Sequence, residues 1–483
     1  MEVSDLTTLI LAFIMVTNIL FAGIVVFIER RDIGSTWAWL MVLHFIPVIG
    51  FIAYLFLGRQ LKQKNFYRLS AEERGYLQSE VVEQLNELKK SEWYRNDTLK
   101  KYADLLKMNL KSSNALITLK NDLAIFSDGH DKFRSLFEDI RNAKKEVHLQ
   151  YYIIQPDSLG KKLRDELTKK AKEGVKVRIL YDEIGSKKIS RSFFKELISY
   201  GGEVEVFFPS ILKLINFRIN NRNHRKLCII DGRIAYIGGF NVGNEYLGLN
   251  KKFGYWRDTH LRIVGDAVND IQGRFILDWN YSAEHKLDLG RLFIQTEKPD
   301  TNVPMQIIAS GPNSETEHIK NMFIKLIMSA KRSVYIQTPY FVPDTSFMDA
   351  CKMALLSGVD VRIMFPNNPD HPFVKWASGV HAGELIKYGA KILLYENGFM
   401  HAKTIVVDQE VASVGTANID RRSFYLNFEV NTIVYDKKIA EQLTQLFLQD
   451  SRKSKELTLD IYQRRSIRIK IKEAVSRLLS PIL

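Results

Sequence analysis

The chain has 483 residues, 46% of them hydrophobic, which is enough for more than one domain with a buried core. Its net charge of +14 predicts attraction to polyanions, either nucleic acid or anionic lipid, and does not choose between them. Only Cys228 and Cys351 are present, which excludes a disulfide scaffold and a cysteine-based zinc site.

Two apolar segments without Asp, Glu, Lys or Arg, residues 6–28 and 33–58, begin the chain. At ~1.5 Å per residue, each is long enough to cross a hydrocarbon core of about 30 Å. Glu2 and Asp5 stand where a signal peptide carries basic residues. We therefore predict a transmembrane helical hairpin over residues 1–58.

Basic residues predict how this hairpin is oriented. Arg30 and Arg31 lie between the two apolar segments and are offset by two acids, whereas a larger group follows the second segment: Arg59, Lys62, Lys64, Arg68 and Arg74. The positive-inside bias then predicts a multi-pass protein of the cell membrane, with both ends of the hairpin and the following domains in the cytoplasm. The aromatic residues near the ends of the second segment are expected at the membrane interface: Trp37, Trp39 and Tyr54.

The chain after residue 58 consists of a connector and two copies of one sequence unit. Residues 59–109 are charged and helix-prone, and predict a solvated helical connector. Beyond them, matched segments recur in the same order, at 143–157 and 330–344, 174–180 and 358–364, and 200–207 and 388–395. Amphipathic stretches alternate with β-branched runs in both units. We predict two duplicated α/β domains with mixed sheets, at 110–295 and 296–483.

Each unit contains the pattern His-x-Lys-x-x-x-x-Asp, followed by a Gly-x-x-Asn segment. The first copy supplies His224, Lys226, Asp231 and Asn241, and the second supplies His401, Lys403, Asp408 and Asn418. Alternation along a strand places each His and its Lys on one face. A single copy would be weak, because a lone histidine is more often structural. Two copies in duplicated units predict one site shared across a pseudo-twofold axis.

The paired motifs resemble those of the phospholipase D superfamily, and the match covers nearly the whole chain. Other segments are similar to bacterial cardiolipin synthases: 29–40, 54–59, 238–248, 255–262, 417–424 and 477–483. This resemblance implies a phosphatidyltransferase that joins two phosphatidylglycerols into cardiolipin and glycerol. The membrane and an anionic phospholipid are then its partners, and nucleic acid is not.

Phosphatidyl transfer needs a nucleophile, a proton donor and cations for the phosphate oxygens. We expect His224 to form a phosphatidyl-histidine and His401 to act as acid and then base, although these two roles can be exchanged. The motif lysines and Asn241 and Asn418 are expected to bind phosphate. The resemblance implies Asp258 and Glu429 as the carboxylates that orient the imidazoles. Asp231 and Asp408 belong to the motif, but their place at the strand ends favours a structural role.

No metal or nucleotide motif is present, so we expect no cofactor. A phospholipase D-type hydrolase and a transferase using another alcohol stay open, and a non-catalytic tether is disfavoured by the intact motifs. Residues 210–220 read equally as a solvated loop or as an interfacial helix, and residues 464–472 as a strand or a membrane-facing helix. The sequence does not indicate an oligomeric state.

Overall fold

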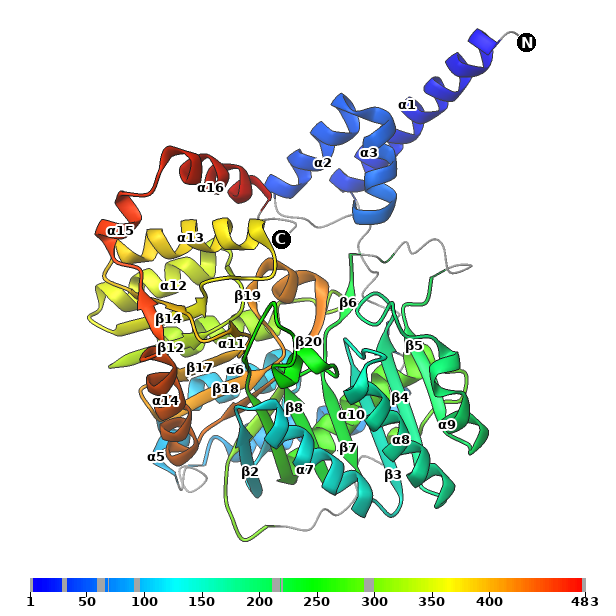
Figure 1. Cartoon of the computed structure of the whole chain (residues 1–483), viewed down its shortest axis with the longest axis vertical. Helices are drawn as coiled ribbons and strands as arrows, with labels where there is room; N and C mark the ends of the chain where they lie inside the picture. The colour runs from blue at the N-terminus through cyan, green and yellow to red at the C-terminus, as the bar shows by residue number, and fades with distance from the viewer. Residues whose placement is uncertain are drawn as a thin grey trace.

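The computed structural model describes residues 3–27, 33–58, 66–67, 69–90, 96–210, 218, 220–290 and 299–479. A helical anchor extends from an α/β body, and the N-terminus lies at the tip of the anchor that is farthest from the body (Figure 1). The expectations for residues 211–217, for the basic connections at 28–32 and 59–65, and for residues 480–483 lie outside the described residues.

The anchor begins with α1 (Val3–Phe27). Within the described part of the chain, this is the one helix that is long and apolar enough to cross a membrane, over Leu6–Phe27. Its large apolar side chains are mostly exposed, as they are in a helix that faces lipid. The first predicted span is therefore present.

The second apolar segment, residues 33–58, is not one continuous helix, so the predicted hairpin of two spanning helices is not confirmed. The segment is divided into α2 (Ile33–Phe45), α3 (Pro47–Ala53) and a π-helical turn, η1 (Tyr54–Gly58). The break falls at Ile46, which has non-helical dihedrals (φ −131°, ψ 64°), directly before a proline that lacks the N–H a helix needs. The rings of Trp39 and Tyr54, both expected at the membrane interface, pack edge to face against each other.

Helices follow the anchor as predicted, at α4 (Ala71–Glu87), α5 (Asp97–Lys101) and α6 (Ala103–Ser113). The expectation that this connector is solvated is wrong at its C-terminal end, where Leu99, Tyr102 and Leu105 are buried. Leu105, Leu106 and Leu110 are fully buried on one face of α6, and the first two belong to the core of the second domain. The helical spacing of these leucines explains the burial.

The first domain is built on a mixed sheet, whose described strands have the order β2-β10-β8-β7-β3-β4-β5. These strands are β2 (Asn121–Phe126), β3 (Glu146–Tyr151), β4 (Lys176–Asp182), β5 (Glu203–Phe207), β7 (Leu227–Ile230), β8 (Ile234–Gly238) and β10 (His260–Gly265). The first matched segment forms β3, which is parallel to β4 with Leu149 opposite Ile179. The covering helices are α7 (Gly129–Asn142), α8 (Ser158–Lys172), α9 (Lys195–Ser199) and α10 (Ala267–Ser282).

The second domain repeats this topology, since its described strands run β11-β20-β18-β17-β12-β14-β15, with β1 and β21 added at the edges. The strands are β1 (Ile117–Thr118), β11 (Met305–Ser310), β12 (Ser333–Gln337), β14 (Asp360–Pro366), β15 (Lys391–Tyr395), β17 (Thr404–Val407), β18 (Val411–Gly415), β20 (Asn427–Val434) and β21 (Ser454–Glu456). The helices are α11 (His318–Met328), α12 (Thr345–Leu356), α13 (Pro372–Ile386), α14 (Lys437–Ser451), α15 (Leu459–Gln463) and α16 (Ile467–Leu479). The duplication into mixed-sheet α/β domains is confirmed.

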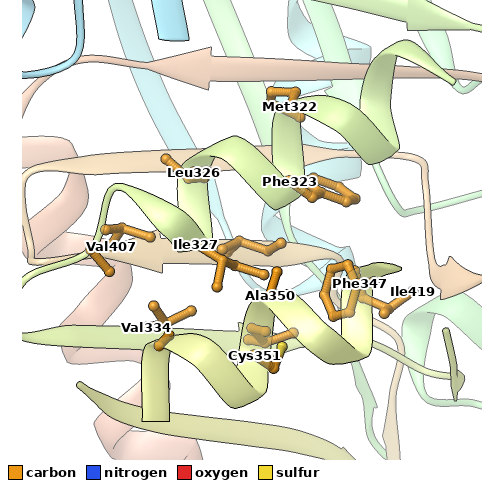
Figure 2. Close-up of a cluster of buried hydrophobic side chains, with 14 of the residues drawn as sticks. Met322, Phe323, Leu326, Ile327, Val334, Phe347, Ala350, Cys351, Val407 and Ile419 are labelled. Atoms are coloured by element: carbon orange, nitrogen blue, oxygen red, sulfur yellow. The ribbon is translucent and has the colours of Figure 1, made fainter. Parts of the chain in front are cut away.

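β7 and β17, in the middle of the two sheets, are buried on both faces, which explains why their sequences, Leu-Cys-Ile-Ile and Thr-Ile-Val-Val, are almost entirely apolar. Figure 2 shows one such core, in which Ile327 of α11 lies near Val334 and Val407 of the second sheet, and Phe347 of α12 lies beside Ile419. A further cluster contains residues of both sheets and of α10 and α14, and therefore joins the two domains.

Candidate active site

Short strands that lead into the two motifs are exchanged between the domains. β6 (Arg222–Asn223) pairs in parallel with β20 of the second domain, and the His224 N–H donates to the Phe428 carbonyl at 3.0 Å. β16 (Phe399–Met400) pairs with β9 (Trp256–Arg257) of the first domain, and the His401 N–H donates to the Arg257 carbonyl at 2.7 Å. The backbone of each motif histidine is thus held by the other domain.

The imidazoles are also paired across the domains. His224 Nδ1 lies 2.9 Å from Glu429 Oε1, and His401 Nδ1 lies 2.5 Å from Asp258 Oδ2. Both carboxylates are fully buried, and each histidine retains less than a tenth of its surface. Each domain therefore supplies one histidine and the carboxylate that orients the other histidine.

The electrostatics of these pairs favour neutral imidazoles beside ionised carboxylates. Burial lowers the pKa of His224 to about 4 and that of His401 to about 3, against the attraction of the carboxylates. Burial opposes ionisation of the carboxylates too, but the histidines and lysines nearby keep the pKa of Asp258 and of Glu429 below their usual values. A neutral imidazole that donates Nδ1–H to a carboxylate leaves Nε2 with a free lone pair.

The motif lysines are buried in the same region. The Nζ groups of Lys226 and Lys403 donate to the carbonyls of His224 and His401 respectively, each at 2.6 Å. Burial and mutual repulsion lower the pKa of Lys226 well below its usual value, and burial lowers that of Lys403 to about 8. Because each lysine lowers the pKa of both histidines, the four side chains form one electrostatic unit.

The two motif asparagines are buried, and both form hydrogen bonds within the protein. Asn241 Oδ1 accepts from the Ile153 N–H at 3.1 Å, and its Nδ2 donates to the Tyr246 hydroxyl at 3.1 Å. Asn418 Nδ2 donates to Asp420 Oδ2 at 3.0 Å. These bonds hold the turns that follow β8 and β18, and phosphate binding by the amides stays a prediction.

The motif aspartates lie at the opposite ends of β7 and β17, roughly 20 Å of strand away from the histidines. Asp231 accepts from the N–H groups of Lys144, Lys145 and Glu146 at 2.7–2.9 Å. Asp408 accepts equivalently from residues 331–333, at 2.7–3.2 Å, and also pairs with Lys101 at 2.9 Å. Grouping them with the catalytic residues of the motif is not supported, while the favoured structural role agrees with these contacts.

The sequence analysis did not predict a further group of buried polar residues, in which glutamine, aspartate and arginine side chains contact each other. Gln150 on β3 donates to Asp278 at 2.6 Å, and Asp278 forms a buried ion pair with Arg225 at 2.5 Å. In the other domain Gln337 on β12 donates to Asp450 at 2.9 Å. The two glutamines occupy the same place in the matched segments, and this was the signal available in the sequence.

Asp450 also forms a 2.8 Å ion pair with Arg257 of the first domain, so this second group of polar residues crosses between the domains.

Small residues lie next to the two buried carboxylates. A Cβ on Gly239 would lie 1.9 Å from Asp258 Oδ1, so the glycine directly after β8 leaves space for the carboxylate that orients His401. Thr416 donates to Glu429 at 2.6 Å and fixes the other carboxylate.

Two protein-family models match the chain. A family model described as "Cardiolipin synthase, PLD-like domain" matches residues 136–273 and 323–451, one stretch in each domain. Another, described as "Phospholipase_D-nuclease N-terminal", matches residues 10–59.

Curated proteins resemble the chain over almost all of its length. The major cardiolipin synthase ClsA of Bacillus subtilis is 53% identical, covering 99% of this chain and 100% of its own. A cardiolipin synthase of Staphylococcus aureus is 52% identical, covering 98% of this chain and 96% of its own. A phosphatidylserine synthase structure from Haemophilus influenzae aligns with a TM-score of 0.60 over 80% of this chain and all of its own; at 15% identity, it supports the fold.

Proposed function

The chain belongs to the cardiolipin synthase family of the phospholipase D superfamily, and we propose that it transfers a phosphatidyl group from one phosphatidylglycerol to another, giving cardiolipin and glycerol. The observation that carries this proposal is the pair of His–carboxylate contacts that cross between the domains. They provide two imidazoles within one electrostatic unit, which a two-step displacement at phosphorus requires.

In the first step His224 Nε2 attacks the phosphorus of a bound phosphatidylglycerol. The bond from phosphorus to the glycerol oxygen breaks, His401 gives that oxygen a proton, and glycerol leaves a phosphatidyl-histidine behind. The low pKa of His224 suits attack, because a neutral imidazole carries the lone pair at neutral pH.

In the second step His401 takes the proton from a glycerol hydroxyl of the second phosphatidylglycerol. The resulting oxygen attacks phosphorus, the P–N bond breaks, and cardiolipin forms while His224 is regenerated. His401 must be protonated in the first step, and an anionic phosphodiester beside it raises its pKa from the low value that burial gives. Exchanging the two histidine roles gives an equivalent scheme.

Lys226 and Lys403 hold the phosphate oxygens in this scheme. Burial lowers their pKa values, and a bound anionic phosphate favours the charged ammonium forms. Asn241 and Asn418 are assigned as further donors, through amide hydrogens not used in the turns. Asp258 and Glu429 act as positioning residues through the histidines.

We divide the chain into an anchor at 1–58, a connector at 59–109 and domains at 110–295 and 296–483, related by a pseudo-twofold axis. The reciprocal pairing of β6 with β20 and of β16 with β9 supports this relation. β1 and α6 lie before β2 in the chain, yet both pack on the second domain. We place the catalytic domains in the cytoplasm, where the basic residues after the anchor are favoured.

We also assign a bilayer contact to α16. Ile467, Ile471 and Val475 recur every fourth residue along one exposed stripe, with exposed fractions of 69%, 57% and 49%. Basic residues flank the stripe on both sides: Arg468 and Lys472 on one side, and Lys470 and Arg477 on the other. Along the long axis of the molecule, α16 lies at the end of the body nearest the anchor (Figure 1). These features fit an anionic lipid surface.

Lipid analysis tests the reaction. The purified full-length protein, incubated with phosphatidylglycerol vesicles, is expected to release glycerol and cardiolipin in equal amounts. His224→Ala and His401→Ala are each expected to abolish product, whereas His285→Ala, at an exposed position outside the site, keeps it. Phosphatidic acid as the product would instead establish a hydrolase, and a requirement for added alcohol would establish another acceptor. Full activity in either site variant would refute the shared site.

A further inference from the structure

The divided segment at residues 33–58 determines how often the chain crosses the membrane. We propose that α2, α3 and η1 form a re-entrant hairpin, which enters and leaves the bilayer on the face where the catalytic body lies. The chain then crosses once, through α1, and its N-terminus lies on the opposite face. This topology replaces the pair of crossings predicted from hydropathy.

Neither arm of the hairpin is long enough to cross. α2 has 13 residues, and α3 with η1 has 7 and 5, so each arm rises about 20 Å or less. A hydrocarbon core is about 30 Å thick. The arms therefore reach beyond the middle of the bilayer without reaching its other face.

Contacts between the arms show that they fold back on each other. The Trp39 and Tyr54 ring centroids lie 5.4 Å apart, whereas fifteen residues of straight helix would separate them by about 22 Å. A Cβ on Gly50 would lie 2.5 Å from the Val42 carbonyl oxygen, so the glycine permits this close approach. Figure 1 shows α2 and α3 folded beside the part of α1 that is nearest the body.

The bend leaves a backbone carbonyl without its usual helical donor, which is unfavourable inside a bilayer, and α1 provides another donor. Pro47 has no N–H to donate to the Leu43 carbonyl, four residues earlier. Asn18 of α1 supplies the missing donor, since its Nδ2 donates to the carbonyls of Leu43 at 3.1 Å and Pro47 at 2.9 Å. Irregular backbone is tolerated at membrane depth where protein groups satisfy it in this way.

The position of Asn18 also sets the depth of the bend. Asn18 lies near the middle of Leu6–Phe27, the spanning part of α1, and only 6% of its surface is exposed. The outer side of the bend is apolar, with Phe45 and Ile49 exposed by 74% and 66%. An exposed apolar tip at this depth belongs in hydrocarbon rather than in water or among headgroups.

Charge favours the same topology. Between Phe27 and Ile33 the chain can span at most about 20 Å, so α2 must start on the face where α1 ends. With one crossing, the basic residues 30–31 and those from 59 onward share one face, while the acidic N-terminal flank, with Glu2 and Asp5, lies on the other. Two crossings would put Arg30 and Arg31 on the face opposite the body.

Cysteine labelling in intact cells separates the two topologies. Both native cysteines are buried, so single added cysteines report alone. We expect Glu2→Cys to react with an impermeant maleimide applied outside, while Glu29→Cys and, as a body control, Ser79→Cys react only after the cells are opened. Two crossings give the reverse for the first two positions, with Glu29→Cys labelled from outside and Glu2→Cys protected. That pattern would overturn the proposal, as would labelling of Ser79→Cys from outside.

Discussion

The histidine–carboxylate pairs contain two charges that the fold has removed from water. A buried carboxylate is stabilised here by an imidazole N–H, a lysine and, for Glu429, a threonine hydroxyl. The imidazole stays neutral because its own burial outweighs the attraction of the carboxylate. In the proposed reaction, one neutral imidazole can then act as the nucleophile, and the negative charge of the substrate favours protonation of the second imidazole.

This arrangement predicts how stability responds to acid. Unfolded histidine titrates near pH 6.5, whereas the folded pKa values of His224 and His401 are about 4 and about 3. Below about pH 6.5 the unfolded chain takes up protons that the folded chain does not, so stability falls as the pH is lowered. The carboxylates, whose folded pKa values are lowered, lose their contribution only in a more acidic window.

Thermal unfolding of the detergent-solubilised protein between pH 7.5 and pH 4.5 measures this dependence. We expect the melting temperature of the His224→Asn, His401→Asn double variant to fall less steeply with acid than that of the unchanged protein. A His130→Asn, His285→Asn double variant, altered at exposed histidines, is the control and should keep the full slope. Parallel slopes for both double variants would contradict neutral histidines at the site.

At the scale of single residues, the sequence predicted which side chains lie in the site better than it predicted which of them contact each other. The repeated pattern identified His224 and His401, and the family resemblance identified Asp258 and Glu429. Nothing in one motif indicates that its histidine binds the carboxylate of the other domain, because this depends on strands exchanged over long sequence separations. The roles of Asp231 and Asp408 were harder to predict, because a repeated pattern shows which residues recur and not what each of them does.

At the scale of helices and strands, prediction from the sequence failed for a different reason. Pro47 was visible within the second apolar segment, yet uncharged length alone suggested a continuous span. The fold-back depends on Gly50, on the ring contact with Tyr54 and on Asn18 from another helix, which no local pattern reveals. The leucines of α6 are a related case, since the charge of the connector predicted a solvated helix and the structure buries one face of it.

The C-terminal helix resolves an open alternative at this scale. Residues 467–479 form α16, which rules out a strand there. One side of the helix packs on α13, where Glu473 lies against Gly379 and pairs with Arg465 at 2.6 Å. Because that side is occupied, the apolar stripe faces away from the body and is available to lipid.

Fluorescence in nanodiscs tests this contact. Full-length protein labelled with bimane at Val475→Cys is expected to show blue-shifted emission in discs rich in phosphatidylglycerol relative to discs of phosphatidylcholine. Adding Lys470→Glu and Arg477→Glu should remove the shift, because the anionic surface then repels the flanks of the helix. Lys161→Glu with Lys176→Glu, exposed on the first domain, matches the charge change and should leave it. An unshifted Val475→Cys signal in both discs would exclude the contact.

The whole molecule differs from a pair of independent enzymes joined by a linker. Both domains have the same sheet order and a complete motif, so each could be thought to carry its own site. The contacts contradict that view, because the first domain orients His401 through Asp258 and the second orients His224 through Glu429. Each copy thus supplies a histidine and the carboxylate that contacts the histidine of the other copy, as the proposed composite site requires.

Conservative changes to the two carboxylates distinguish these architectures. In a composite site, Asp258→Asn or Glu429→Gln alone removes the group that orients one essential imidazole, and each is expected to lower kcat for cardiolipin formation by about 10²–10⁴-fold with little change in KM. Independent sites would instead leave roughly half the activity in each variant. Glu138→Gln and Glu456→Gln, exposed carboxylates with one in each domain, should retain full activity. The double variant should lose little more than the worse single one, because both residues serve the same reaction cycle.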